Sequence, residues 1–203
     1  MDRQEHWENI YKTKKLTEVS WYEPIPETSL EFIKGMNLAK NAAIIDVGGG
    51  DSFLADFLLM EGYTNVSVLD ISEEALNRVK KRLGERAEEI HWIVEDVTKF
   101  QPEQKYDLWH DRAAFHFLTE EDQVKQYLDI LKNAVIPGGL VVIATFSEKG
   151  PTKCSGIEIK QYSINGLAEL LSEDFEMVSC KNVSHETPSG AAQDFIFCSF
   201  RRK

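Results

Sequence analysis

The sequence is poor in cysteine, in long apolar runs and in positive charge. Its 203 residues include only 3 cysteines, which form no Cys-x-x-Cys pair: Cys154, Cys180 and Cys198. Disulfide frameworks and cysteine-rich metal sites use even numbers or close spacings of cysteine. We therefore expect neither, and we interpret all three side chains as reduced thiols.

Long apolar runs are missing as well. No run approaches the roughly 20 residues that a membrane-spanning helix requires. Residues 1–5 lack the apolar stretch that a secretory signal peptide carries. We therefore expect a cytoplasmic protein that does not cross a membrane.

Positive charge is scarce. The 23 lysines and arginines stand against 34 aspartates and glutamates, so the formal net charge is −11. Binding to nucleic acid or to an anionic membrane surface needs clustered lysines and arginines. The negative net charge therefore disfavours nucleic acid and anionic membranes as partners. Residues 43–72 contain five acids and no lysine or arginine. Such an acidic segment suits a cationic ligand better than a phosphate-bearing one.

The apolar residues are arranged as in one α/β domain. The length fits a single domain, and 42% of the residues are hydrophobic. From about residue 43 onward, short apolar runs alternate with amphipathic segments, which is typical of α/β architecture. Near-continuous apolar strands suit a parallel sheet that is buried on both faces. The expected parallel strands are residues 43–47, 66–70, 90–94, 106–110 and 140–146, and the helices between them are residues 52–60, 72–83 and 119–134.

The two ends of the chain differ from this pattern. Residues 163–171 are expected to form a helix, and residues 175–181 and 193–201 are expected to be two strands that pair as an antiparallel end hairpin. Residues 1–42 contain helical segments near 5–12 and 28–36, on either side of a break at residues 21–26. Because this segment is too short to fold alone, we expect residues 1–42 to form a helical cap on the domain of residues 43–203.

The strongest local signal is a strand that ends in Asp46 and runs through Gly48, Gly49 and Gly50 into a helix. Glycines let the backbone approach a ligand closely, and the start of a helix offers unpaired N–H groups. A dinucleotide fold would need a further glycine where Phe53 stands, and no lysine follows as in a phosphate-binding loop. The loop therefore favours a nucleotide-like ligand without phosphates, and the alternative is an ordinary tight turn.

Acidic residues also end the next two strands. Asp70 ends the second strand, where a carboxylate can accept hydrogen bonds from both hydroxyls of a ribose. Asp96 follows the third strand, in a place suited to an exocyclic amine. A single such acid is commonly a helix cap. Acids at three successive strand ends beside a glycine loop indicate a ligand site.

These motifs resemble those of the class I S-adenosylmethionine-dependent methyltransferases, over roughly residues 43 to 200. Residues 46–50 match the family's acid-x-Gly-x-Gly loop, Asp70 with Ile71 its ribose-binding position, and Asp96 with Val97 its adenine-contacting pair. Ser52 departs from the pattern, because many members carry a further glycine there. The resemblance implies a three-layer Rossmann-like fold, a seven-stranded and mostly parallel sheet with an antiparallel end strand, and S-adenosylmethionine as the cofactor, with S-adenosylhomocysteine as its product.

A narrower resemblance lies in two places. One is the aromatic N-terminal segment that carries Trp7, Tyr11 and Trp21, here called the leader, and the other is the Asp111-Arg112 pair after the fourth strand. Both are similar to the thiol (thiopurine-type) methyltransferases, and also to a group that includes lysine modifiers of metabolic enzymes. In such proteins the leader covers the cofactor. The resemblance thus implies that Trp7 and Trp21 face the sulfonium or methionyl end, where an aromatic face suits a cation. The alternative is that both pack in the core of the cap.

Candidate catalytic residues cluster after the fourth strand. A thiol or amine acceptor must be deprotonated when it attacks, so a nearby base would help. Asp111 and Arg112 lie at the carboxyl end of the strand, where ligands of open α/β sheets bind, and Asp111 is also assigned to the cofactor. Arg112 suits the cofactor carboxylate or an anionic acceptor, or it forms a salt bridge to Asp111 or Asp107. His116, on an apolar segment that we expect to be helical, is the third candidate, with core packing as its alternative, whereas we interpret His110 as a buried histidine with a satisfied ring.

The segment of residues 147–162 is polar and rich in glycine and proline. We therefore expect a mobile loop on the acceptor side. Either Cys154 or Tyr162 touches the acceptor there, or both simply lie in a surface loop.

Together the motifs predict methyl transfer to a sulfur, nitrogen or oxygen atom of a small molecule such as a thiol. The alternatives are a protein lysine as acceptor, or a module that binds the cofactor without catalysis. No metal is expected, and the protein is expected to be a monomer or a dimer.

Overall fold

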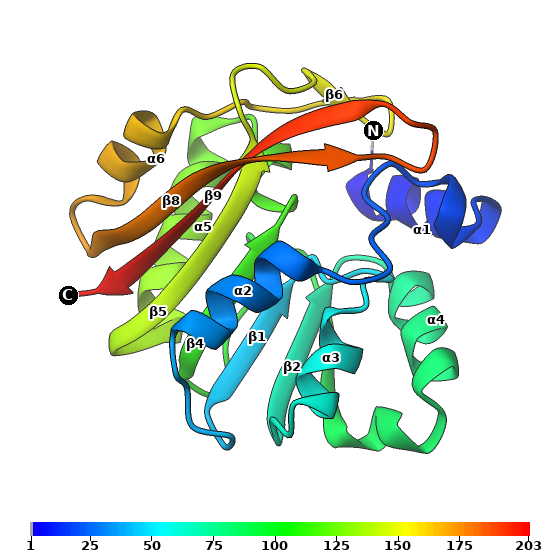
Figure 1. The fold of residues 1–203 in the computed structure, drawn as a ribbon, viewed down its shortest axis with the longest axis horizontal. Coiled ribbons are helices and arrows are strands. Elements are labelled where there is room, and N and C mark those ends of the chain that lie inside the picture. The colour runs from blue at the N-terminus through cyan, green and yellow to red at the C-terminus, as the bar shows by residue number, and fades with distance from the viewer. Residues whose placement is uncertain (1) are drawn as a thin grey trace.

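The computed structural model describes residues 2–203 and contains one seven-stranded sheet with helices on both faces (Figure 1). The helices are α1 (Arg3–Thr13), α2 (Glu27–Gly35), α3 (Leu54–Met60), α4 (Glu73–Leu83), α5 (Glu121–Ala134) and α6 (Ile164–Leu171), with 3-10 turns η1 (Leu16–Glu18), η2 (Gly84–Glu89) and η3 (Phe115–Phe117). The strands are β1 (Ala43–Val47), β2 (Asn65–Asp70), β3 (Ile90–Val94), β4 (Tyr106–Arg112), β5 (Val135–Phe146), β6 (Lys153–Cys154), β7 (Ile157–Glu158), β8 (Phe175–Glu186) and β9 (Ala192–Arg202).

The large sheet has the order β3-β2-β1-β4-β5-β9-β8. Strands β1 to β5 pair in parallel, and β9 runs antiparallel to both of its neighbours, β5 and β8. The predicted Rossmann-like sheet is therefore confirmed. The strand order reverses between β1 and β4, and open α/β sheets bind ligands beyond the carboxyl ends of the strands at such a reversal.

Each face of the sheet carries its own apolar core. On one face, α5 packs Tyr127 and Leu131 against the strands, and both side chains are fully enclosed. On the other face, α2 and α3 contribute Ile33 and Leu58 to a second cluster. Because both faces are covered, the central strands are buried almost throughout, which explains their continuous apolar sequences.

Local chemistry sets the ends of α4. The Ser72 hydroxyl accepts a hydrogen bond from the Ala75 amide over 3.2 Å and caps the first turn. Gly84 ends the helix with a φ of 60°, a conformation that glycine adopts at little cost.

Three segments differ from the sequence expectations. Strand β5 begins at Val135 rather than at residue 140, because a register shift opposite β4 accommodates the proline and glycines at 137–139. The segment that carries His116 is a 3-10 turn and not a longer helix. The expected loop at residues 147–162 contains a short hairpin, in which β6 pairs with β7.

The expectation of three reduced cysteines is wrong for two of them. Cys180 on β8 lies opposite Cys198 on β9, and the two form a disulfide across the hairpin, with Cα atoms 4.1 Å apart. Counting cysteines cannot reveal such a pair, since the register of the two strands brings them together. Cys154 is a free thiol, as expected, and it is buried.

The N-terminal helices lie on the domain that follows them. Figure 1 shows α1 beside α4 and α2 across the sheet near β1 and β4. The Glu8 carboxylate on α1 accepts hydrogen bonds from the Glu73 and Glu74 amides at the start of α4, over 2.7 and 3.3 Å. This anion at a helix start is favoured by the helix dipole. The division into a cap of residues 1–42 and a domain of residues 43–203 stays a prediction. Within residues 2–203, no helix combines the length and the apolar character needed to cross a membrane.

Candidate functional site

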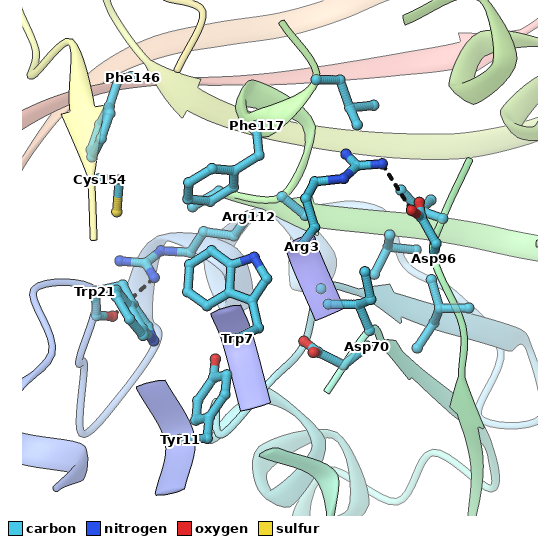
Figure 2. Close-up of a pocket in the computed structure, with 18 of the residues that line it drawn as sticks. Arg3, Trp7, Tyr11, Trp21, Asp70, Asp96, Arg112, Phe117, Phe146 and Cys154 are labelled. Atoms are coloured by element: carbon cyan, nitrogen blue, oxygen red, sulfur yellow. Dashed lines mark hydrogen bonds and ion pairs between the residues drawn. The ribbon is translucent and has the colours of Figure 1, made fainter. Parts of the chain in front are cut away.

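The main pocket lies at the carboxyl edge of the sheet (Figure 2). One side, here called the acidic half, is formed by Gly48, Asp70, Ile71, Asp96 and Val97 after β1, β2 and β3. The other side, called the cationic half, is formed by Arg112, Phe146, Cys154, Gln193 and Phe195 from β4, β5, β6 and β9. Figure 2 shows Trp7 and Phe117 between Asp70 and Asp96 on one side and Phe146 and Cys154 on the other.

The glycine loop is held in a shape that only glycine adopts without strain. Gly48 and Gly50 have φ angles of 63° and 48°, in the left-handed region. A Cβ added at Gly48 would lie 2.4 Å from Ala114 Cβ, and one at Gly50 would lie 2.4 Å from Tyr11 Oη. The Gly48 and Gly49 amides both donate to the Leu69 carbonyl. Gly48 lines the main pocket, Gly49 faces a second hollow beneath the leader, and Gly50 packs against Tyr11.

Asp46 lies beneath this loop and outside the lining of the main pocket. Its Oδ1 is 2.7 Å from His110 Nδ1, and His110 Nε2 is 2.9 Å from Ser29 Oγ on α2. All three residues are at most 3% exposed. The interpretation of His110 as a buried, satisfied histidine is confirmed. The Asp46 carboxylate therefore supports the loop from below and ties it to α2.

Asp70 is the acid that the pocket presents most directly. One carboxylate oxygen accepts the Ser72 amide over 2.8 Å, and the side chain lines the pocket although the residue is only 6% exposed. Burial raises the pKa of Asp70 to about 7, against the opposing effect of the Ser72 and Gly50 amides. A ligand that donates hydroxyl hydrogens here would favour the ionised form.

Asp96 is held on both of its oxygens. Oδ1 accepts from the Thr98 amide and hydroxyl, and Oδ2 accepts from Arg3 Nη2 over 2.8 Å. Sequence reasoning missed Arg3, since nothing near the start of the chain marks it as a partner of Asp96. Ile71 and Val97 line the pocket beside these acids. The acidic half is thus closed on one side by α1.

The aromatic leader covers the pocket. Trp7 stands edge-to-face against Trp21 and Phe117, with ring centroids 5.7 and 5.0 Å apart. Trp7, Tyr11 and Trp21 all line the pocket. Packing within the cap and a position facing the ligand are therefore compatible for Trp7 and Trp21, because the two rings pack on one another and also line the pocket.

Asp111 and His116 do not line the pocket. The Asp111 carboxylate is fully buried and accepts hydrogen bonds from the Ala114 and Phe115 amides and from the Tyr127 hydroxyl. Burial raises the pKa of Asp111 to about 6. The position of Asp111 therefore supports neither its assigned catalytic role nor its assigned cofactor contact, because its oxygens hold the turn after β4.

His116 is enclosed in the core. Its ring stacks on Phe146 with centroids 4.7 Å apart, and the residue has no exposed surface. Burial, with a contribution from the charge of Arg112, lowers the pKa of His116 to about 3. A neutral, enclosed ring fits the core interpretation and gives no support to a catalytic role.

Arg112 lines both hollows and is the one candidate catalytic residue that reaches the pocket. Its Nη1 donates to the Trp21 carbonyl over 3.1 Å, and its Nη2 lies 3.0 Å from Glu23 Oε1. The salt-bridge alternative with Asp111 or Asp107 is wrong, because the ionic partner is Glu23.

The loop after β5 contributes one of its two candidates. Cys154 lines the pocket, and burial raises the pKa of its thiol. Tyr162 instead stacks on Phe115, with centroids 5.2 Å apart, and does not line the pocket. Phe146, Gln193 and Phe195 were missed. Apolar strand residues such as Phe146 and Phe195 look the same in a sequence whether they face a pocket or a core, and no motif marks Gln193.

Parts of this sequence are similar to those of known methyltransferases. Residues 44–139 match the model of a methyltransferase domain. The chain is 33% identical over 106 residues, 52% of its length, to malonyl-(acyl-carrier protein) O-methyltransferase 2 of Ilyobacter polytropus, and it spans only 39% of that protein. It is 25% identical over 189 residues to EEF1A lysine methyltransferase 2 of Danio rerio, which covers 86% of this chain and 75% of that protein.

A solved structure agrees in fold. It is that of 1,6-didemethyltoxoflavin-N1-methyltransferase of Burkholderia thailandensis with bound 1,6-didemethyltoxoflavin and S-adenosylhomocysteine. The TM-score is 0.71 at 18% sequence identity, and the match covers 96% of this chain and 81% of the other.

Proposed function

We propose that this chain, which carries a class I, S-adenosylmethionine-dependent methyltransferase domain, transfers a methyl group to a nucleophilic atom of a small molecule. The observation that carries the proposal is the place of Asp70, a buried acid that lines the pocket directly beside the glycine loop. The thiopurine-type group is a resemblance of the leader and of residues 111–114, and the assignment to it is part of this proposal.

The acidic half suits the adenosine part of S-adenosylmethionine. Asp70 offers a carboxylate to vicinal hydroxyls, and Ile71 and Val97 offer apolar walls to a planar base. Asp96 lies beside them, where an exocyclic amine would meet an acid. No phosphate-binding group is required, which agrees with the acidic character of residues 43–72.

When bound, S-adenosylmethionine supplies a methyl group on a sulfonium that is already electrophilic. The protein then has to align an acceptor and exclude water. Trp7, Trp21 and Phe117 cover the pocket and would do the latter. Among residues 2–203, no histidine lines the main pocket.

A small acceptor fits the covered pocket better than a folded protein does. Trp7 packs edge-to-face against Trp21 and Phe117, and all three rings line the pocket, so a protein surface would have to displace them to enter it. The rival is a protein lysine, which the similarity to the Danio rerio lysine methyltransferase favours. The two acceptors separate in one experiment: a cell extract is incubated with the protein and methyl-labelled cofactor and is then fractionated. We expect label in the small-molecule fraction, and label confined to a protein band would contradict this acceptor class.

Cofactor binding is tested by calorimetry with S-adenosylhomocysteine. We expect one molecule bound per chain, with binding impaired by Asp70→Asn and unchanged by Asp122→Asn, the same substitution at an exposed site on α5. Wild-type protein that does not bind S-adenosylhomocysteine would overturn the proposal. Tight binding without transfer across a panel of thiols, amines and acids would point to the third possibility, a module that only binds the cofactor.

A further inference from the structure

A charged cluster lies at the wall of the cationic half. Glu23, in the leader, is 3.0 Å from Arg112 Nη2 and 3.1 Å from His185 Nδ1. His185 lies near the end of β8 and is 5% exposed. One carboxylate is therefore shared by two basic side chains.

His185 holds the leader against β8. Nε2 lies 2.7 Å from the Ser20 carbonyl, which can only accept, so this nitrogen carries a hydrogen. Burial pushes the pKa of Glu23 upward, but the hydrogen bond with His185 and the charge of Arg112 lower it below its usual value. Glu23 is therefore an ionised partner of Arg112, and its carboxylate lies beside the guanidinium.

The Arg112 guanidinium also has unmet hydrogen-bonding capacity. Nε and Nη2 are enclosed, and neither makes a hydrogen bond within the described chain of residues 2–203. Nη2 is close to Glu23 without the alignment of a hydrogen bond. Buried polar groups are rarely left unpaired in folded proteins, so these two N–H groups point to an acceptor from outside the chain. Two adjacent N–H groups on one planar fork match the two oxygens of a carboxylate.

The side chains around Arg112 limit the kind of molecule that can carry such a carboxylate. Phe146 and Phe195 line the same half, and the Arg112 guanidinium lies over the Phe195 ring, 5.4 Å from its centroid. These walls suit an apolar or aromatic body. The Glu23 carboxylate already offsets positive charge beside Arg112, which disfavours a phosphate monoester with close to two negative charges. The planar guanidinium fork and the apolar walls together favour a carboxylate.

We propose that the methyl acceptor is a carboxylic acid with an apolar body, bound through its carboxylate to Arg112 in the cationic half. Its identity as the acceptor rests on the proposed function, whereas the carboxylate site itself does not. Arg112 holds one end of the molecule, and Phe146 and Phe195 hold its body. The nucleophilic atom is then the end that faces the acidic half.

The test uses matched acids and amides. Protein saturated with S-adenosylhomocysteine is titrated with benzoate and benzamide, and with 3-phenylpropionate and its amide, by calorimetry. We expect at least one acid to bind about tenfold more tightly than its amide, because a charged guanidinium fork discriminates between the two. The proposal is overturned if neither acid binds more tightly than its amide.

Variants of Arg112 and Glu23 test whether Arg112 causes the preference for the acid over its amide. Arg112→Gln should abolish it, and Arg112→Lys should weaken it, because a lysine keeps the charge but loses the planar fork. Glu23→Gln should strengthen binding of the acid about threefold or more, since it removes the competing carboxylate. Lys153→Gln removes an exposed lysine next to Cys154 that already pairs with Glu158, and it should change nothing. If Arg112→Gln does not fold, the affinities of Arg112→Lys and Glu23→Gln for acid and amide still test the proposal.

The same titrations separate the two proposals. If Arg112→Gln abolishes binding of S-adenosylhomocysteine, Arg112 holds the cofactor carboxylate and the acceptor assignment is overturned, while methyl transfer stands. If wild-type protein does not bind S-adenosylhomocysteine, the proposed function fails. The acid-over-amide preference, measured without S-adenosylhomocysteine, then still confirms or overturns the carboxylate site.

Discussion

The two halves of the pocket are built in different ways. The acidic half comes from residues that directly follow three parallel strands, and backbone amides fix several of its side chains, as with Asp70 and Asp96. The cationic half combines Arg112 with aromatic residues of β5 and β9 and with Glu23 of the leader, which are far apart in sequence. The comparison indicates that the acidic half depends on local backbone geometry, whereas the cationic half depends on how distant segments pack.

The largest expected effect tests the backbone of the acidic half. Gly48→Ala should lower the free energy of unfolding by about 2–5 kcal/mol, the sum of left-handed strain and overpacking against Ala114. Gly62→Ala is the matched control, because Gly62 also has a positive φ but open space around it. Urea denaturation should give a clearly smaller loss for Gly62→Ala. Equal losses would remove the steric contribution of the close contact with Ala114.

The next effect concerns the hairpin that contributes to the cationic half. Reduction of the Cys180–Cys198 disulfide should lower the free energy of unfolding by about 2–4 kcal/mol, as is typical for a disulfide. Affinity for S-adenosylhomocysteine should stay the same, since neither cysteine lines the pocket. Thermal melts with and without a reductant measure the effect. A Cys180→Ser variant whose melting is as sensitive to the reductant as that of the wild type would contradict it.

The third effect tests the central acid of the acidic half. Asp70→Ala should weaken binding of S-adenosylhomocysteine by about 1–3 kcal/mol, because the ribose hydroxyls lose their acceptor. Calorimetry at pH 8 gives the difference directly. An unchanged dissociation constant would refute the assignment of Asp70 to the ribose.

The smallest effect is a pH dependence. Because burial raises the pKa of Asp70 to about 7 and hydroxyl donors favour its ionised form, affinity for S-adenosylhomocysteine should fall as the pH drops below about 7. The expected slope is up to tenfold per pH unit, about 1.4 kcal/mol, with a plateau at higher pH. Asp70→Asn should flatten the profile. A slope that persists in this variant would assign the proton to another group.

The sequence allowed the acidic half to be predicted because its residues follow a local rule. A strand end, a glycine loop and an acid specify a position at the carboxyl edge of the sheet, and Asp70, Asp96 and Gly48 lie there. The alternation of strands and helices followed from the apolar pattern.

The cationic half could not be predicted to the same extent, because its residues depend on side-chain direction and on distant packing. Successive residues of a strand point to opposite faces, so Arg112 reaches the pocket while Asp111 turns into the core toward Tyr127. A strand-end position alone does not distinguish the two. Glu23 and Phe195 reach Arg112 only through folding, and no motif marks either of them.

The most direct test of the two-halves account is a pair of dissociation constants for S-adenosylhomocysteine, measured for Asp70→Asn and Arg112→Gln under the same conditions. The account predicts that Asp70→Asn weakens binding about tenfold or more and that Arg112→Gln changes it by less than about twofold. An Arg112→Gln variant that loses binding while Asp70→Asn retains it would contradict the account.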